Sequence, residues 1–216
     1  MSLGKIQHHL SRIYEIDVEH DVDDFLITDP ELARALDDND GARDSREKLL
    51  VRREGDEVDV ALYVDPAVIE HLASDDPADT LHDGNLDDYW VALEGVSHFL
   101  YFVWNTHHRR TVSRLELEMQ AEVDKYVSAA FLIGRQCAGR VPVELHRLLF
   151  AGCSFDEALA DDDLELYRSA NHYAGRYCEQ LTRTYLRDRR RDGMMSELRR
   201  FYRLTQHGKI RRITAH

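Results

Sequence analysis

The segment from Leu86 to Thr106 constrains the fold more than any other part of the chain, because it is apolar on nearly every side of a helix. At 100° per residue, its apolar side chains cover most of the helical circumference. They are Leu86, Tyr89, Trp90, Val91, Leu93, Val96, Phe99, Leu100, Phe102, Val103 and Trp104. A helix of this kind is usually central to a fold, so we predict that the other elements pack around it.

A β-hairpin is predicted upstream of this helix, over residues 48–64. Apolar and polar residues alternate in its second strand, 58–64, and the turn falls at 54–57, which contains Gly55. A two-stranded hairpin is only marginally stable alone, so a third strand or a helix must cover it. The alternation of apolar and acidic residues at 14–19 makes that segment the candidate for the third strand.

Caps and helical spacing predict that most of the remaining chain is helical. Asp-Pro pairs at 29–30 and 65–66 supply the N-cap and the first-turn proline of short helices. Capping boxes begin at Ser113 and Ser154. The predicted helices cover 29–36, 65–73, 86–106, 113–136, 142–150 and 164–187, with a last helix that begins after Gly193.

These elements together predict an α+β protein that is predominantly α. Residues 1–75 form a small α+β segment with short helices and the antiparallel hairpin, or a three-stranded sheet built on it. Residues 76–216 form an α-helical bundle. The polar stretch 74–85, with Pro77 and Gly84, is the one plausible boundary. The sequence leaves open whether the two parts are separate or form one continuous domain.

Composition excludes several classes of protein. With 216 residues, of which 43% are hydrophobic, the chain can bury a core without a metal or a disulfide. No apolar run reaches the ~18 residues of a membrane helix, and the N-terminus lacks the features of a secretory signal. The cysteines Cys137, Cys153 and Cys178 form no CxxC pair, so we expect small buried residues in a cytoplasmic protein.

The chain is acidic, and its charge is unevenly distributed. The formal net charge is −13, and residues 1–100 hold 26 acidic and 8 basic residues, whereas residues 101–216 hold 15 and 20. We expect the two parts to pair within the fold or in a homodimer; the alternative is a basic tail for an acidic partner. Arginine exceeds lysine by 24 to 4, which indicates a compositional bias of a bacterial type and not a function.

The polar strip of the central helix contains Glu94 and His98, which are four residues apart and can touch. Such a pair can be a carboxylate that orients an imidazole for acid–base catalysis, or two ligands of a metal ion. The alternative is a strip that faces solvent, or an internal hydrogen bond that satisfies a partly buried histidine. The sequence alone favours this structural alternative.

The next helix adds Glu118 and Glu122, again four residues apart. Like charges at this spacing repel, so Arg114 and Lys125 are expected to pair with them in a surface ladder of ions. The alternative is that both carboxylates meet the Glu–His pair across the interface of the two helices and hold a divalent metal ion. The spacing departs from the Glu-x-x-His pattern of four-helix di-iron proteins. The candidate metal ligands are Glu94, His98, Glu118 and Glu122.

The absence of GxGxxG, P-loop, HExxH, GxSxG and EF-hand motifs leaves function open. We predict foremost a binding or regulatory protein that acts through contacts with a protein partner or as a homo-oligomer. The aromatic side chains of the central helix would supply its interface. The alternative is a metal- or Glu/His-dependent enzyme with its site on the helices 86–106 and 113–136 and a divalent metal ion as its cofactor.

A lesser alternative is contact with nucleic acid through the arginine-rich C-terminal region. Arg199, Arg200 and Arg203 stand beside Phe201 and Tyr202, a combination that can follow phosphates. The net charge of −13 repels a polyanion, and both aromatic residues also suit the core face of a helix. We therefore expect no nucleic-acid partner.

Overall fold

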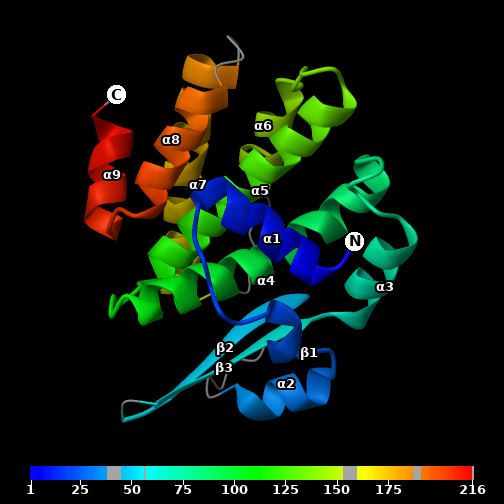
Figure 1. Cartoon of the computed structure of the whole chain (residues 1–216). Coiled ribbons are helices and arrows are strands. Elements are labelled where there is room, and N and C mark those ends of the chain that lie inside the picture. The colour runs from blue at the N-terminus through cyan, green and yellow to red at the C-terminus, as the bar shows by residue number, and fades with distance from the viewer. Residues whose placement is uncertain (38–44, 56, 153–159, 187–190, 216) are drawn as a thin grey trace.

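The structure, a computed structural model, describes residues 1–37, 45–55, 57–152, 160–186 and 191–215 (Figure 1). Its helices are α1 (Leu3–Tyr14), α2 (Pro30–Leu36), α3 (Pro66–Ser74), α4 (Asp83–His107), α5 (Arg114–Gln136), α6 (Glu144–Phe150), α7 (Asp161–Leu181), α8 (Arg191–Tyr202) and α9 (Gln206–Thr214). Its strands are β1 (Leu26–Ile27), β2 (Glu47–Glu54) and β3 (Glu57–Val64). The fold is mainly α with a small mixed sheet, as the sequence predicts. No helix in these ranges is long and apolar enough to cross a membrane.

Helix α4 runs through the centre of the molecule, as its apolar surface predicts. It has β2 and β3 against one side, and α1, α3 and α5 pack around the rest (Figure 1). The aromatic residues expected to supply an interface belong to this core instead. Buried among them are Tyr89, Phe99, Tyr101, Phe102 and Trp104. In this conformation these side chains are not available to a partner protein, so that expectation is wrong for them.

The sheet has the strand order β1-β3-β2. The antiparallel pair of β2 and β3 is the predicted hairpin, and the two strands pair along their whole length. Gly55, in the turn between them, has a φ of 63°, a left-handed conformation that glycine adopts at little cost. The third strand is β1, which runs parallel to β3 with Leu26 opposite Leu62.

The strand predicted at 14–19 is wrong, because its first residue ends a helix. The buried residues of α1 follow the helical period: Leu3, Ile6, Leu10, Ile13 and Tyr14. Ser2 caps the start of this helix, and Glu15 ends it with a left-handed φ of 49°. The alternation of apolar and acidic residues at 14–19 is therefore a weaker signal than the helical spacing of the apolar residues that precede it. His8 and His9 lie on this packed helix.

The helix starts predicted from the caps at Asp29, Asp65 and Ser113 are confirmed. The helices predicted from 86, 142 and 164 begin instead at Asp83, Glu144 and Asp161. Asp29 caps α2, accepting a hydrogen bond from the backbone N–H of Glu31 at 2.9 Å, and Asp65 caps α3 in the same way. Ser113 and Glu116 form the capping box of α5. The capping box predicted at Ser154 lies outside the described residues.

The C-terminal helices differ from the prediction at two points. α7 ends at Leu181 and continues as a π-helical segment, η2 (Thr182–Leu186), and the predicted end at Arg187 lies outside the described residues. Gly193 lies inside α8 and not before it. A Cβ built at Gly193 would lie 2.9 Å from the ring of Tyr185, so the packing of this ring requires a glycine there.

The last helix, α9, is not predicted. Thr205 caps it by accepting a hydrogen bond from the backbone N–H of Gly208 at 3.3 Å. Its buried face consists of Lys209 and Ile213. Because one of these two buried residues is a lysine, the segment has no continuous apolar stripe, and the sequence pattern does not predict a helix there.

One hydrophobic core runs through both predicted parts of the chain. Leu10, Leu62 and Val68 belong to the same cluster of buried residues as Val96 and Val123. A smaller cluster lies between α2 and the other face of the sheet, and it consists of Ala33, Leu50 and Tyr63 (Figure 1). The division of the chain after residue 75 stays a prediction.

Candidate metal centre

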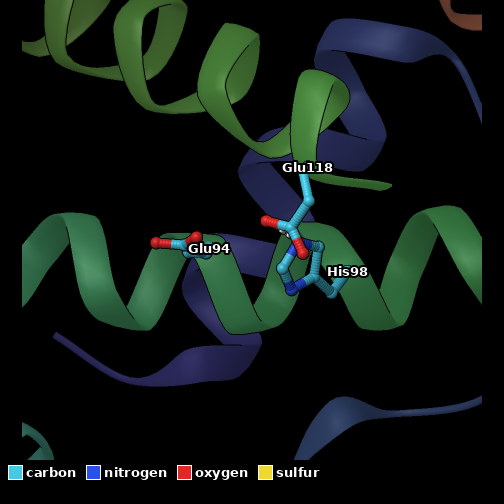
Figure 2. A group of neighbouring side chains, drawn as sticks. All are labelled: Glu94, His98 and Glu118. Carbon is cyan, nitrogen blue, oxygen red and sulfur yellow. Dashed lines mark ion pairs between the residues drawn. The ribbon is translucent and has the colours of Figure 1, made fainter. Parts of the chain in front are cut away.

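Helices α4 and α5 bring Glu94, His98 and Glu118 together. Glu94 and His98 lie one turn apart on α4, and Glu118 reaches them from the beginning of α5 (Figure 2). Each residue offers one ligand atom, and these atoms all lie within 4.8 Å of one another. The structure therefore brings together three of the four ligands that the sequence nominates.

His98 lies between two carboxylates. Its Nε2 is 3.6 Å from Oε2 of Glu118, and its Nδ1 is 3.6 Å from Oε2 of Glu47. The residue is 6% exposed, and Nε2 has no hydrogen-bond partner, because 3.6 Å is too long for a hydrogen bond. Burial by itself would lower the pKa of His98, but the carboxylates of Glu118 and Glu47 outweigh burial and raise it well above its usual value.

Glu47 reaches the site from the sheet, where it is the first residue of β2. Gly95 permits this approach: a Cβ built there would lie 3.0 Å from Cδ1 of Leu62 and 3.2 Å from Oε2 of Glu47, closer than ordinary contact. Burial raises the pKa of Glu47, against the opposing effect of His98. Oε2 of Glu47 has no hydrogen-bond partner.

Lys125 of α5 holds two further carboxylates. Its Nζ lies 3.0 Å from Oε2 of Glu94 and 2.5 Å from Oε1 of Glu122. Burial would lower the pKa of Lys125, but these two carboxylates outweigh it and raise the pKa. Burial likewise would raise the pKa of Glu94, but Lys125 outweighs it and lowers that pKa. In Glu122 burial dominates, and the pKa is raised despite the same lysine.

The site holds more negative than positive charge. Among the described residues, the ion pairs join Glu47 and Glu118 to His98, and Glu94 and Glu122 to Lys125. With all six groups ionised, four negative charges face two positive ones. Buried charge without a partner is costly. Burial raises the pKa values of Glu47 and Glu122, and the facing carboxylates raise the pKa of His98. A divalent cation would supply the missing positive charge.

The surface ladder of ions expected on α5 is only partly present. Lys125 does pair with Glu122, but it is 7% exposed and so lies in the interior. Arg114 pairs with Asp163 of α7 at 2.7 Å. Glu122 lies outside the group of converging ligand atoms that contains Glu118.

Sequence reasoning missed Glu47 and the buried position of Lys125. Both depend on tertiary packing: Glu47 reaches His98 only because the hairpin crosses α4 closely. The signal that could have indicated this contact is Gly95, because a glycine inside a long apolar helix marks a place where another element comes near.

A second buried polar network joins α1, α4, α5 and α9, and the sequence did not indicate it. Asp124 accepts hydrogen bonds from the hydroxyls of Tyr14 and Ser97. The side chain of Gln120 donates to Asp124 at 2.9 Å and accepts from Lys209 at 2.6 Å. Burial raises the pKa of Asp124 to about 6 and lowers the pKa of Lys209 to about 7. All these side chains are enclosed, so the network connects helices inside the fold.

Two of the three C-terminal arginines considered for nucleic acid, Arg199 and Arg203, make contacts within the chain, whereas Arg200 is exposed. Arg199 pairs with Glu15 at 2.8 Å, and Arg203 donates hydrogen bonds to backbone carbonyl oxygens at the end of α1. Phe201 and Tyr202 are buried, as expected for a core face. The pairing of Arg199 with Glu15 is an instance of the expected attraction between the basic end and the acidic part of the chain. The absence of a nucleic-acid partner stays a prediction.

The cysteines are less uniform than expected. Cys178 is buried, and burial raises the pKa of its thiol well above the usual value. Cys137 is exposed, contrary to prediction, because it lies at the C-terminal end of α5. Cys153 lies outside the described residues.

Comparison of the chain with known protein families, with curated proteins and with solved structures finds no match. The chemistry of the centre therefore has to be interpreted from its own geometry.

Proposed function

We propose that the protein is a metal-dependent enzyme and that this centre binds its divalent transition-metal ion. The ligands are Nε2 of His98 and the carboxylates of Glu94 and Glu118. One observation carries the proposal: Nε2 belongs to a histidine that is 6% exposed, has no hydrogen-bond partner and faces a carboxylate at 3.6 Å. Imidazole nitrogens and carboxylate oxygens are ligands of zinc, iron and manganese.

The distances suit a single ion after a small adjustment. Ligand atoms around a zinc-like ion lie ~2.0–2.2 Å from it, so two of them can be up to about 4.4 Å apart. The ligand atoms of Glu94, His98 and Glu118 lie within 4.8 Å of one another, so rotation of a carboxylate closes the remaining gap.

Glu47 supports the ligand set from outside it. It lies beside Nδ1 of His98, the nitrogen that does not face Glu118. A carboxylate in that position keeps the remaining proton on Nδ1 and leaves Nε2 free for the ion. We therefore assign Glu47 the role of orienting His98.

Three protein ligands favour a catalytic ion over a structural one. Structural zinc sites generally have four protein ligands, whereas catalytic sites leave a position for water or substrate. An ion held by these residues would lower the pKa of a bound water toward 7 and so supply hydroxide at neutral pH. The reaction class that this arrangement supports is hydrolysis by metal-activated water.

Binding is tested by calorimetric titration of chelator-treated, tag-free protein with Zn²⁺ and with Mn²⁺. We expect wild type to bind an ion, and His98→Gln to lose at least tenfold in affinity, because replacing a metal ligand costs that much or more. His172→Gln is the matched control, since His172 is an exposed histidine on α7. Equal affinity in wild type and His98→Gln would contradict the proposal.

Catalysis is tested separately, with a panel of chromogenic phosphate and carboxylate esters and the metal-loaded protein. We expect hydrolysis of at least one class, lost in Glu118→Gln and retained in His172→Gln. Hydrolysis that survives Glu118→Gln unchanged would place the activity elsewhere.

A second candidate function is binding of a protein partner, or of a second copy in a homodimer. For either function we propose a location in the cytoplasm. Leu32 and Leu36 favour binding of a partner, because they lie one turn apart on α2 and are 46% and 44% exposed. Sedimentation of wild type and of Leu32→Ser tests it. We expect association in wild type that the variant weakens; a monomer at all concentrations that captures no partner would contradict it.

A further inference from the structure

We infer that Lys125 occupies the place of a second cation, so that the centre takes one metal ion and not two. The inference rests on the proposed metal site and assigns Lys125 as the residue that determines how many ions it holds.

The first observation is that Glu94 lies between two groups. Its Oε2 is 3.0 Å from Nζ of Lys125, and its ligand atom also lies within 4.8 Å of those of His98 and Glu118. Figure 2 shows Glu94 one turn along α4 from the facing pair of His98 and Glu118. A carboxylate with a cation on each side is the arrangement of two-metal sites, in which the ions lie about 3.5–4 Å apart.

The second observation is that the ammonium of Lys125 is fixed in this position. It contacts Glu94 and Glu122 at 3.0 and 2.5 Å, and the residue is 7% exposed. Oε2 of Glu122 is buried without a hydrogen-bond partner, so Lys125 is the partner on which this carboxylate depends. Movement of the lysine into solvent would leave two buried carboxylates unpaired, which is costly.

Charge balance leads to the same conclusion. One divalent ion and Lys125 place three positive charges against the carboxylates of Glu47, Glu94, Glu118 and Glu122. Without the ammonium, Glu94 and Glu122 face a position that lacks a cation. A second divalent ion would bind there, with Glu94 shared between the two ions and Glu122 as a ligand of the second ion alone.

The test is native mass spectrometry of tag-free protein loaded with excess Mn²⁺ and then desalted. We expect one ion per chain in wild type and two in Lys125→Met, which keeps most of the length of the side chain and removes its charge. Lys125→Arg restores a cation and is expected to bind one ion. Lys5→Met is the matched control with one ion, because Lys5 is an exposed lysine of α1, with 67% of its side chain accessible.

The outcomes distinguish this inference from the proposed function. No ion in wild type overturns both. Two ions in wild type, or one ion in both wild type and Lys125→Met, overturn the role of Lys125 and leave the metal site standing. If Lys125→Met does not fold, the electron paramagnetic resonance spectrum of wild type with Mn²⁺ shows whether the centre holds one ion or two. An isolated six-line spectrum supports one ion, and an exchange-coupled spectrum contradicts it.

Discussion

Nε2 of His98 and Oε2 of Glu118 face each other across two helices at 3.6 Å, with side chains that are only 7% and 14% exposed. This distance is too long for a hydrogen bond. Two tetrahedral ligands that each lie about 2.1 Å from an ion are about 3.4 Å apart. The pair is therefore spaced as two ligands of one ion, and the consequences of that spacing can be measured.

Metal affinity is expected to rise with pH. The pKa of His98 is raised well above its usual value, so a proton competes with the ion for Nε2 through the neutral range. Below that raised pKa, we expect the affinity for Zn²⁺ to increase by up to about tenfold for each pH unit. Titration calorimetry from mildly acid to mildly alkaline pH measures this slope. An affinity that does not change with pH would show that Nε2 of His98 is not a ligand.

The stability of chelator-treated protein should respond to pH in the opposite direction. The pKa of His98 is higher in the folded than in the unfolded chain, so its protonation stabilises the fold fully below about pH 6.5. This contribution is lost as the pH rises through the raised pKa. Urea unfolding of wild type and of His98→Gln measures it: the advantage of wild type should shrink as the pH rises. A constant or growing advantage would contradict the assigned shift.

Gly95→Ala should weaken the packing of the hairpin on α4. Alanine favours a helix by up to about 1 kcal/mol, but its Cβ would lie 3.0 Å from Leu62 and 3.2 Å from Glu47. We expect the overpacking cost of about 1–3 kcal/mol to outweigh this gain, with a net loss of up to about 2 kcal/mol in the free energy of unfolding. Metal binding should weaken because Glu47 moves.

Gly134→Ala is the matched control for that substitution. Gly134 lies in α5, and its Cβ would meet only Val141, at an ordinary 3.7 Å. We expect a gain of about 0.5–1 kcal/mol by chemical denaturation. If both alanine variants gained stability, the close approach at Gly95 would not be needed.

Lys209→Met should change how stability depends on pH. Burial lowers the pKa of Lys209 to about 7, against 10.5 for an ordinary lysine, so the folded protein favours the neutral amine. Wild type is therefore expected to gain about 1.4 kcal/mol over the variant for each pH unit between about 7 and 10.5. Thermal or urea unfolding across this range measures the gain. Parallel stability profiles would mean that Lys209 stays charged in the fold.

The sequence predicted the elements whose signals are local. The apolar circumference around Leu86–Thr106 identified the central helix, and alternation around Gly55 identified the hairpin. Two helices were missed for local reasons: α1 competes with a short alternating segment, and α9 buries Lys209 where an apolar residue is expected. Predicting these two helices requires knowledge of the core residues that they cover, and those residues are distant in the sequence.

The candidate site was predictable only along the helices. The four-residue spacing nominated Glu94 with His98, and the same spacing nominated Glu118 together with Glu122 as the carboxylates that could meet them. Glu47 lies far away in the sequence and joins the site through the contact of β2 with α4, which no spacing rule describes. Lys125 was predicted as a surface partner, and its burial between two carboxylates likewise follows from tertiary packing.

Metal in the protein as it is purified would show whether Glu94, His98 and Glu118 hold an ion. We would measure it by plasma mass spectrometry of natively purified, tag-free protein, with His98→Gln purified in parallel. We expect about one transition-metal ion per chain in wild type and a marked loss in the variant. Wild type that contains no transition metal, and takes none up from an excess of Zn²⁺ or Mn²⁺, would contradict the proposed metal site.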